Sequence, residues 1–122
     1  MSVKKYFNLA KNLMFPICRS ITGAGLKQTL KIIQSEFPKL KIYSVRSGTK
    51  VFDWKVPSEW NVNDAYVLDK NFKKIINFQD NNLHLVSYSM PINKLLSKKK
   101  LFENLYSLRN KPNAIPYITS YY

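Results

Sequence analysis

The residue types that most often bind a catalytic metal are scarce in this chain. It has one histidine, His84, one cysteine, Cys18, and seven aspartate and glutamate residues. A zinc site needs three or four such side chains that converge on one point. His84 lies between two leucines in a predicted strand, and the acidic residues show no spacing typical of an acid–base pair. The sequence therefore assigns no catalytic residue and no metal ligand to this chain.

A short glycine-containing segment offers a second kind of chemistry. Gly23 and Gly25 follow Thr22 directly before a predicted helix. Backbone N–H groups at a helix N-terminus can hold a carboxylate or a phosphate, so the segment is a candidate anion-binding site. The pattern is only Gly-x-Gly and does not follow a strand, so it is not a dinucleotide-binding fingerprint. The alternative interpretation is a tight connector whose glycines let two helices pack closely.

Two tryptophans provide the third candidate. Trp54 and Trp60 stand on either side of a turn at Pro57, with Lys55 nearby. Indole rings can stack on a sugar or a base, which makes this region a candidate sugar- or peptide-binding β domain. The alternative is that one ring packs in a sheet while the other anchors the turn.

Helical periodicity covers the first forty residues. Apolar residues recur at spacings of three and four from Val3 to Met14, which predicts a helix over 3–14 that ends before Pro16. A second apolar stripe, over 26–37, predicts another helix that ends at Pro38. The two helices are joined by a short, turn-rich link.

From residue 41 the pattern changes to that of strands. We expect short strands at 42–45, 51–56, 64–68, 73–78 and 83–89, with a hairpin turn at 69–71. Ser97 has the residue type of an N-cap and precedes a predicted helix over 98–108. The predicted fold class is α+β: an N-terminal helical pair, then a small, mainly antiparallel β-rich domain, then a C-terminal helix.

The net charge of the chain bears on whether it binds nucleic acid or an anionic surface. The 122 residues carry a net charge of +13, which would attract polyanions, so a basic module that binds nucleic acid or an anionic surface is an alternative function. Lysine supplies most of this charge, whereas bidentate recognition of phosphates and bases prefers arginine. We therefore interpret the charge as a solvated lysine surface and do not expect nucleic-acid binding.

The predicted location is the cytoplasm. No apolar run reaches the roughly 20 residues that span a bilayer. The N-terminal segment is interrupted by Asn8, Lys11 and Asn12 and lacks the features of a signal peptide. A single cysteine excludes an internal disulfide, which agrees with a reducing compartment.

Four stretches carry a family resemblance. They are FPICRSITGAG at 15–25, SGTKVFDWKVPSEWNVNDAYV at 47–67, NNLHLVSYSMPIN at 81–93 and IPYITSYY at 115–122, in this order. Together they resemble the N-terminal part of a bacterial aminopeptidase-like family, a domain of unknown function with a zinc-exopeptidase fold that is often encoded in surface-polysaccharide gene clusters. The resemblance covers nearly the whole chain.

This resemblance implies how the chain is organised. Residues 1–40 would be the helical segment of a peptidase-like domain, 41–110 a β-rich insert, and 111–122 the start of the return into the peptidase domain. Zinc, its ligands and the general base would belong to sequence beyond Tyr122, so we expect an N-terminal fragment that has no cofactor and no activity by itself. The implied partner is the missing peptidase domain, and the full-length protein would act on a peptide or peptide-like substrate.

The resemblance also marks site residues. Three of them match the family's turn between the helices and would face the cleft of a complete protein: Arg19, Ser20 and Thr22. Three others match the signature of the β insert, as ligand contacts or as structural residues: Asp53, Trp54 and Trp60. If the helices and the tail normally pack on a missing domain, their apolar stripes are exposed here, and we expect self-association through them.

Overall fold

The structure, a computed structural model, describes residues 2–116 and divides the chain after His84 into two compact units. The first unit contains a helical segment and small antiparallel sheets, and the second contains a short helix. This mixture confirms the predicted α+β class. The predicted return into a peptidase domain falls partly on residues 117–122, which lie outside the described residues.

The first helical run confirms the prediction over residues 3–14. It consists of α1 (Val3–Leu9) followed directly by a π-helical turn, η1 (Ala10–Met14). The run ends here because Pro16 has no N–H to donate and its ring disfavours a helical conformation in the residue before it. The second helix, α2 (Ala24–Glu36), lies where its apolar stripe predicts it and ends just before the next proline.

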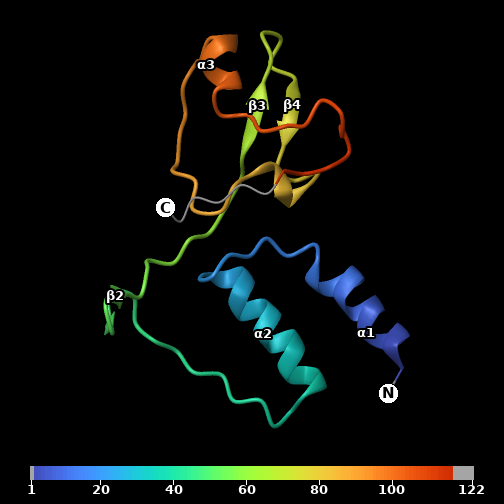
Figure 1. The fold of residues 1–122 in the computed structure, drawn as a ribbon, viewed down its shortest axis with the longest axis vertical. Helices are drawn as coiled ribbons and strands as arrows, with labels where there is room; N and C mark the ends of the chain where they lie inside the picture. Colours follow the sequence, from blue (N-terminus) through green and yellow to red (C-terminus); the bar gives the residue numbers. More distant parts are fainter. Residues whose placement is uncertain (1, 117–122) are drawn as a thin grey trace. The chain divides into compact units, whose positions relative to one another are not determined.

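α1 and α2 form an antiparallel pair (Figure 1). The rings of Tyr6 and Phe37 stack with their centroids 6.1 Å apart and their planes 11° from parallel. Lys5 forms an ion pair with Glu36 beside these rings. The start of α1 therefore lies beside the end of α2, as a short link between two helices requires.

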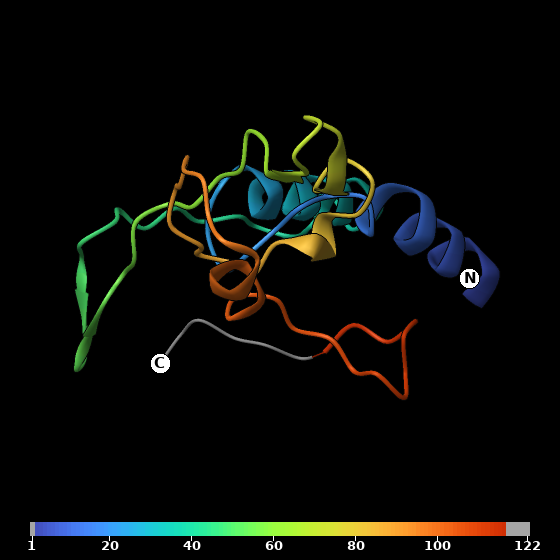
Figure 2. The same cartoon turned by 90° about the horizontal axis from the view of Figure 1, so that it is seen from above.

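The predicted strand over 51–56 is wrong, because this segment is a tight hairpin. β1 (Lys50–Val51) pairs antiparallel with β2 (Trp54–Lys55), and the chain reverses at Phe52, which has a φ of 52°. Side chains alternate between two faces in one continuous strand and also in two short strands joined by a two-residue turn. The alternating sequence pattern therefore does not distinguish these two structures. The hairpin extends away from α1 and α2 in both views, and Phe52 is 91% exposed (Figure 1, Figure 2).

The predicted strand at 42–45 is also wrong. Residues 41–46 have no regular structure, and all of them are exposed. A strand needs a neighbour to pair its backbone N–H and C=O groups, and no other segment within 2–116 pairs with this one.

The second hairpin confirms two predicted strands and the turn between them. β3 (Tyr66–Leu68) pairs antiparallel with β4 (Lys74–Asn77). The Asp69 carboxylate accepts hydrogen bonds from the backbone N–H groups of Asn71 and Lys73, at 2.8 and 2.9 Å. This side chain closes the turn locally. The turn was predicted because asparagine tolerates the left-handed conformation, but the residue with a positive φ is Phe72, at 60°, rather than Asn71.

The predicted strand at 83–89 is wrong. The short 3₁₀ helix η2 (Asn82–His84) occupies its beginning, and residues 85–89 contain no strand. The Asn81 side-chain oxygen accepts a hydrogen bond from the Leu83 N–H at 2.9 Å. Asparagine side chains compete in this way with strand pairing. His84 therefore lies in a helical turn rather than in a strand.

In the second unit, α3 (Lys98–Phe102) begins where predicted but is shorter than predicted. Ser97 is its N-cap, and the hydroxyl accepts a hydrogen bond from the Lys100 N–H at 3.3 Å. The Asn104 side chain donates to the Lys100 carbonyl at 3.1 Å. In a longer helix the Asn104 backbone N–H would make this hydrogen bond, so the side chain replaces it and the helix ends. Three lysines in the first turn also oppose the helix dipole.

Among residues 2–116, no hydrophobic side chain is buried. The one buried residue is Thr29 in α2, 5% exposed, whose hydroxyl donates to the Gly25 carbonyl at 2.9 Å. The described helices include none that is long and apolar enough to cross a bilayer. Local hydrogen bonds and a few contacts between segments, rather than a packed core, define this part of the fold.

Candidate functional site

The start of α2 is a crowded junction between three segments of the first unit. Gly23 has a φ of 91°, and a Cβ atom there would lie 2.4 Å from the Trp60 carbonyl oxygen. A Cβ atom on Gly25 would lie 1.9 Å from the Cys18 carbonyl oxygen. Each glycine therefore permits a backbone approach that any side chain would block. This is the close approach that the connector interpretation requires.

A side chain from a distant segment also caps this helix. The Ala24 N–H donates to the Asn61 side-chain oxygen at 2.7 Å. The Ala24 N–H is thus already bound to the Asn61 side chain, whereas the anion-binding interpretation requires this group to bind a ligand. Anion binding at the N–H groups that follow stays a prediction.

Thr22 links the connector to the segment before Trp60. Its hydroxyl donates to the Ser58 carbonyl at 3.2 Å and accepts from the Trp60 N–H at 3.3 Å. Because one hydroxyl holds both backbone groups, the two segments are held in register.

Arg19 and Ser20 make short-range contacts. The Arg19 guanidinium donates to the Met14 carbonyl at 2.6 Å, which satisfies an acceptor at the end of η1. The Ser20 hydroxyl donates to the Thr22 carbonyl at 3.1 Å and closes the turn before α2. These residues support the connector in the structure. The prediction that they face a cleft in a complete protein stays a prediction.

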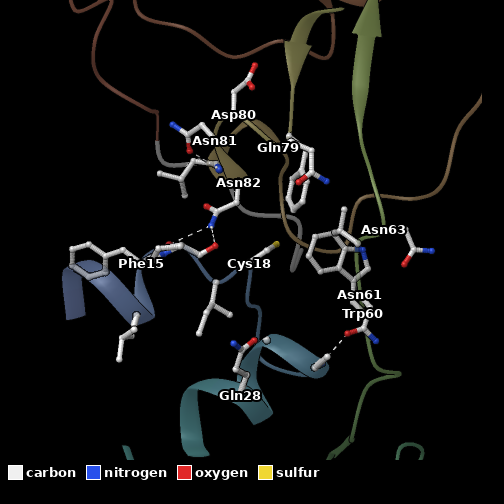
Figure 3. A pocket seen from close by; sticks show the side chains of 18 of the residues that line it. Phe15, Cys18, Gln28, Trp60, Asn61, Asn63, Gln79, Asp80, Asn81 and Asn82 are labelled. Carbon is white, nitrogen blue, oxygen red and sulfur yellow. Dashed lines mark hydrogen bonds between the residues drawn. The ribbon is translucent and has the colours of Figure 1, made fainter. Parts of the chain in front are cut away.

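An open pocket of about 950 Å³ lies in the first unit beside this junction (Figure 3). Four segments line it: 12–18, 24–28, 60–63 and 78–83. Seven of its 19 lining residues carry a carboxamide and three carry an aromatic ring, and we call it the amide pocket. The polar and aromatic lining residues are Asn12, Gln28, Asn61, Asn63, Gln79, Asp80, Asn81, Asn82, Phe15, Trp60 and Phe78.

Hydrogen bonds fix part of the lining. Asn82 donates from its side chain to the Phe15 and Pro16 carbonyls, at 3.3 and 3.2 Å. This contact joins the 78–83 segment to the connector. Asn61 is fixed by its 2.7 Å hydrogen bond to the Ala24 N–H of α2. Asparagines from two segments, one of them at the start of η2, therefore hold the walls in place.

The pocket carries little charge although the chain is strongly basic. None of its lining residues is a lysine or an arginine, and Asp80 is the acidic one. Partial burial raises the pKa of the Cys18 thiol on the pocket wall, which keeps it in the neutral form. The site suits a polar ligand without negative charge.

The predicted residues of the β insert are not brought together. Trp60 is half-buried and lines the amide pocket. Trp54 lies in β2 and is 51% exposed, and Asp53 is an exposed residue of the hairpin turn. Within the described residues, Trp54 and Trp60 therefore do not form a joint surface on which a ligand could stack.

The asparagines and glutamines of the pocket were missed by sequence reasoning. The sequence analysis assigned no functional role to Gln28, Asn61, Asn81 or Asn82. A signal was present in the asparagine-rich segments at 61–63 and 81–82, but nothing in their spacing indicates that they meet.

The described residues do not fit a zinc site. Nowhere in 2–116 do three or more His, Cys, Asp or Glu side chains gather as a metal ion requires. The Nδ1 atom of His84 lies 2.9 Å from the Asn77 carbonyl oxygen, so this ring is engaged with the backbone. A zinc ion in a complete protein would therefore need ligands from outside the described residues.

Comparison with known proteins places the chain in a family. It is 50% identical over 116 residues to a Clostridium acetobutylicum protein described as "Putative polysaccharide biosynthesis protein with aminopeptidase-like domain", covering 95% of this chain and 26% of that protein. A crystal structure of a "putative peptidase" from the same organism matches with a TM-score of 0.89 and 48% identity, over 98% of this chain and 28% of the other. The chain thus spans about a quarter of the length of these relatives.

These matches confirm the resemblance to aminopeptidase-like proteins. The family described as "Domain of unknown function (DUF2172)" matches residues 59–122, which is more than half of the sequence. The chain therefore belongs to this DUF2172 family.

Proposed function

We propose that this chain is the scaffold portion of a zinc-dependent aminopeptidase-like hydrolase whose metal ligands and general base lie outside the matched segment. The observation that carries the proposal is the structural match: nearly all of this chain corresponds to about a quarter of a protein described as a peptidase, at 48% identity. Similarity of this degree supports the same fold and the same place in a larger molecule.

The physical state of the chain agrees with a scaffold role. No hydrophobic side chain among residues 2–116 is buried, whereas a domain that folds alone normally has its own core. Exposed apolar residues of the first helical run, such as Val3 at 85% and Phe7 at 61%, are available to pack on a further domain. The proposed partner is the peptidase domain of the same protein.

The role of this chain in the complete protein would be structural rather than catalytic. Thr22, Gly23 and Gly25 bring the connector, α2 and the segment at 58–61 together. In a complete protein this junction would support the cleft wall, and the substrate would be a peptide or peptide-like molecule. The single thiol of Cys18 agrees with a cytoplasmic location, which we include in the proposal.

Three proteins test the proposal: this chain alone, the intact C. acetobutylicum relative, and a chimera in which this chain replaces the matching segment of that relative. Each is assayed for hydrolysis of aminoacyl p-nitroanilides with and without Zn²⁺, and its bound zinc is measured. We expect hydrolysis that a chelator abolishes in the relative and the chimera, and neither hydrolysis nor stoichiometric zinc in the chain alone.

Each other outcome contradicts a defined part of the proposal. Turnover by the isolated chain with one bound zinc would show that its own residues form the active site. An inactive chimera beside an active relative would refute the equivalence of the two segments. An intact relative that hydrolyses none of these substrates would overturn the aminopeptidase assignment.

A further inference from the structure

We infer that the amide pocket binds an uncharged saccharide. The inference rests on residues of the first unit alone, and it requires no hydrolytic activity. The pocket volume of about 950 Å³ falls at the upper end of the range of roughly 300–1,000 Å³ found for small-molecule sites, so a short oligosaccharide fits.

The first argument is electrostatic. The sequence has 20 lysine and arginine residues, yet none lines this pocket. A site that selects a phosphorylated or sulfated ligand places cations around it. The Asp80 carboxylate would in addition repel an anion, while one of its oxygens accepts a hydrogen bond from the Asn77 side chain at 3.2 Å. The pocket therefore selects against anions.

The second argument is the supply of hydrogen-bonding groups. Four carboxamide side chains of the lining, those of Asn12, Gln28, Asn63 and Gln79, make no hydrogen bond to another described residue and are exposed. Each carboxamide offers a carbonyl acceptor and two N–H donors. A sugar hydroxyl is both a donor and an acceptor, so a cluster of carboxamides can satisfy several adjacent hydroxyls.

The third argument is the presence of aromatic surface. Trp60 and Phe78 line the same pocket as the carboxamides. In Figure 3 the Trp60 and Asn61–Asn63 side chains lie on one side, the Gln79–Asn82 side chains on another, and Gln28 comes from α2. The Trp60 backbone is held by the Thr22 hydroxyl at 3.3 Å, which limits movement of this wall. The apolar face of a sugar ring can pack on such an indole.

A peptide ligand is less well matched. Peptides commonly bind by extending a sheet edge, where strand N–H and C=O groups pair with the ligand backbone. The four lining segments include no residue of β1, β2, β3 or β4. The polar contacts available to a ligand are therefore side-chain amides, which favours hydroxyl groups over an extended backbone.

The experiment uses the whole chain with the substitution Trp54→Phe, which leaves Trp60 as its single tryptophan. Its fluorescence is titrated with neutral mono- to trisaccharides of glucose, galactose, mannose, rhamnose and N-acetylglucosamine, each up to about 10 mM, a concentration suited to weak affinities. We expect a saturable change with at least one of them. Side-chain amide NMR signals of Gln28 and Asn63 should shift in the same titration.

Matched variants locate the site. Gln28→Ala and Asn63→Ala each remove a carboxamide that makes no hydrogen bond to the described chain, so both variants should keep the parent's circular dichroism. We expect each to weaken saccharide binding about 3- to 10-fold, the effect of one neutral hydrogen bond. Asn8→Ala removes an exposed asparagine of α1 outside the pocket and should leave the affinity unchanged.

The inference is overturned by any of three results. One is the absence of a saturable response to every saccharide in the set. Another is binding that survives both pocket variants, which would place the ligand elsewhere. The last is tighter binding of triglycine amide or of dextran sulfate than of any neutral sugar. None of these readouts requires hydrolysis, so failure here is distinguishable from failure of the peptidase proposal.

Discussion

Replacing Gly25 by alanine should destabilise α2, although helix propensity alone predicts the opposite. Within a helix, glycine to alanine is normally stabilising by about 1 kcal/mol, because alanine loses less conformational entropy. Gly25 lies in the first turn of α2, so a reading of the sequence would suggest this substitution as an improvement.

The atoms around Gly25 reverse the sign of the stability change expected for Gly25→Ala. A Cβ atom there would lie 1.9 Å from the Cys18 carbonyl oxygen, 2.9 Å from the Cys18 carbonyl carbon and 3.1 Å from the Arg19 Cα. Ordinary contact begins at 3.4 Å, so the difference requires the Cys18 carbonyl to move by about 1.5 Å. All three atoms belong to the backbone, and a rotation of a side chain cannot relieve the contact.

The magnitude follows from these two opposing effects. Overpacking of this kind costs about 1–3 kcal/mol and occasionally more, and the contact with Cys18 is severe enough for the upper end of that range. After the gain in helix propensity is subtracted, we expect a net destabilisation of α2 by about 2 kcal/mol. This corresponds to hydrogen exchange of the α2 amides that is about 30-fold faster.

The assay is native-state hydrogen exchange of α2, accompanied by circular dichroism at 222 nm. Gly48→Ala is the control: Gly48 has a φ of 83° but no atom within 4 Å of a Cβ position. That variant should lose about 1–2 kcal/mol of backbone stability in its own turn and leave α2 unchanged. Slower exchange, or unchanged exchange, in Gly25→Ala would refute the close approach of the connector to α2.

Three further predictions concern other contacts. Asn61→Ala removes the acceptor for the Ala24 N–H and should destabilise α2 by about 0.5–2 kcal/mol in the same exchange experiment, whereas Asn63→Ala should not. Because partial burial raises the pKa of the Cys18 thiol, the folded chain holds this proton more tightly than the unfolded chain; its contribution to stability is present below the unfolded pKa and is lost as the pH rises through the folded pKa. Iodoacetamide at about pH 8 should therefore alkylate Cys18 more slowly in buffer than in urea, and equal rates would contradict this. Since no hydrophobic side chain in 2–116 is buried, sedimentation should reveal association that grows with concentration, and a monomer at every concentration would count against exposed packing faces.

Features that depend on neighbouring residues could be predicted from the sequence. The run over 3–14 ends near Pro16 because proline lacks a donor, and the turn after β3 forms because the Asp69 carboxylate binds N–H groups two and four residues later. Ser97 was recognisable as an N-cap for the same reason. In each case the interacting groups are separated by a few residues.

Predictions from the local sequence pattern were wrong where the same pattern fits two conformations. Alternation over 51–56 fits a strand as well as the hairpin that turns at Phe52. The apolar residues at 83–89 looked like a strand, but the Asn81 side chain holds the beginning of this segment in a 3₁₀ turn. A strand requires a partner, and the sequence does not state which segment will supply one.

The sequence by itself determined the positions of the two helices, the turn at Asp69 and the family resemblance. Only the tertiary structure decided that Asn61 caps α2, that Asn82 holds the connector, and that carboxamides from four segments meet beside Trp60. The physical reason is sequence separation. The partners in these contacts lie 37 and 67 residues apart, so the path of the chain between them, rather than any local preference, brings them together.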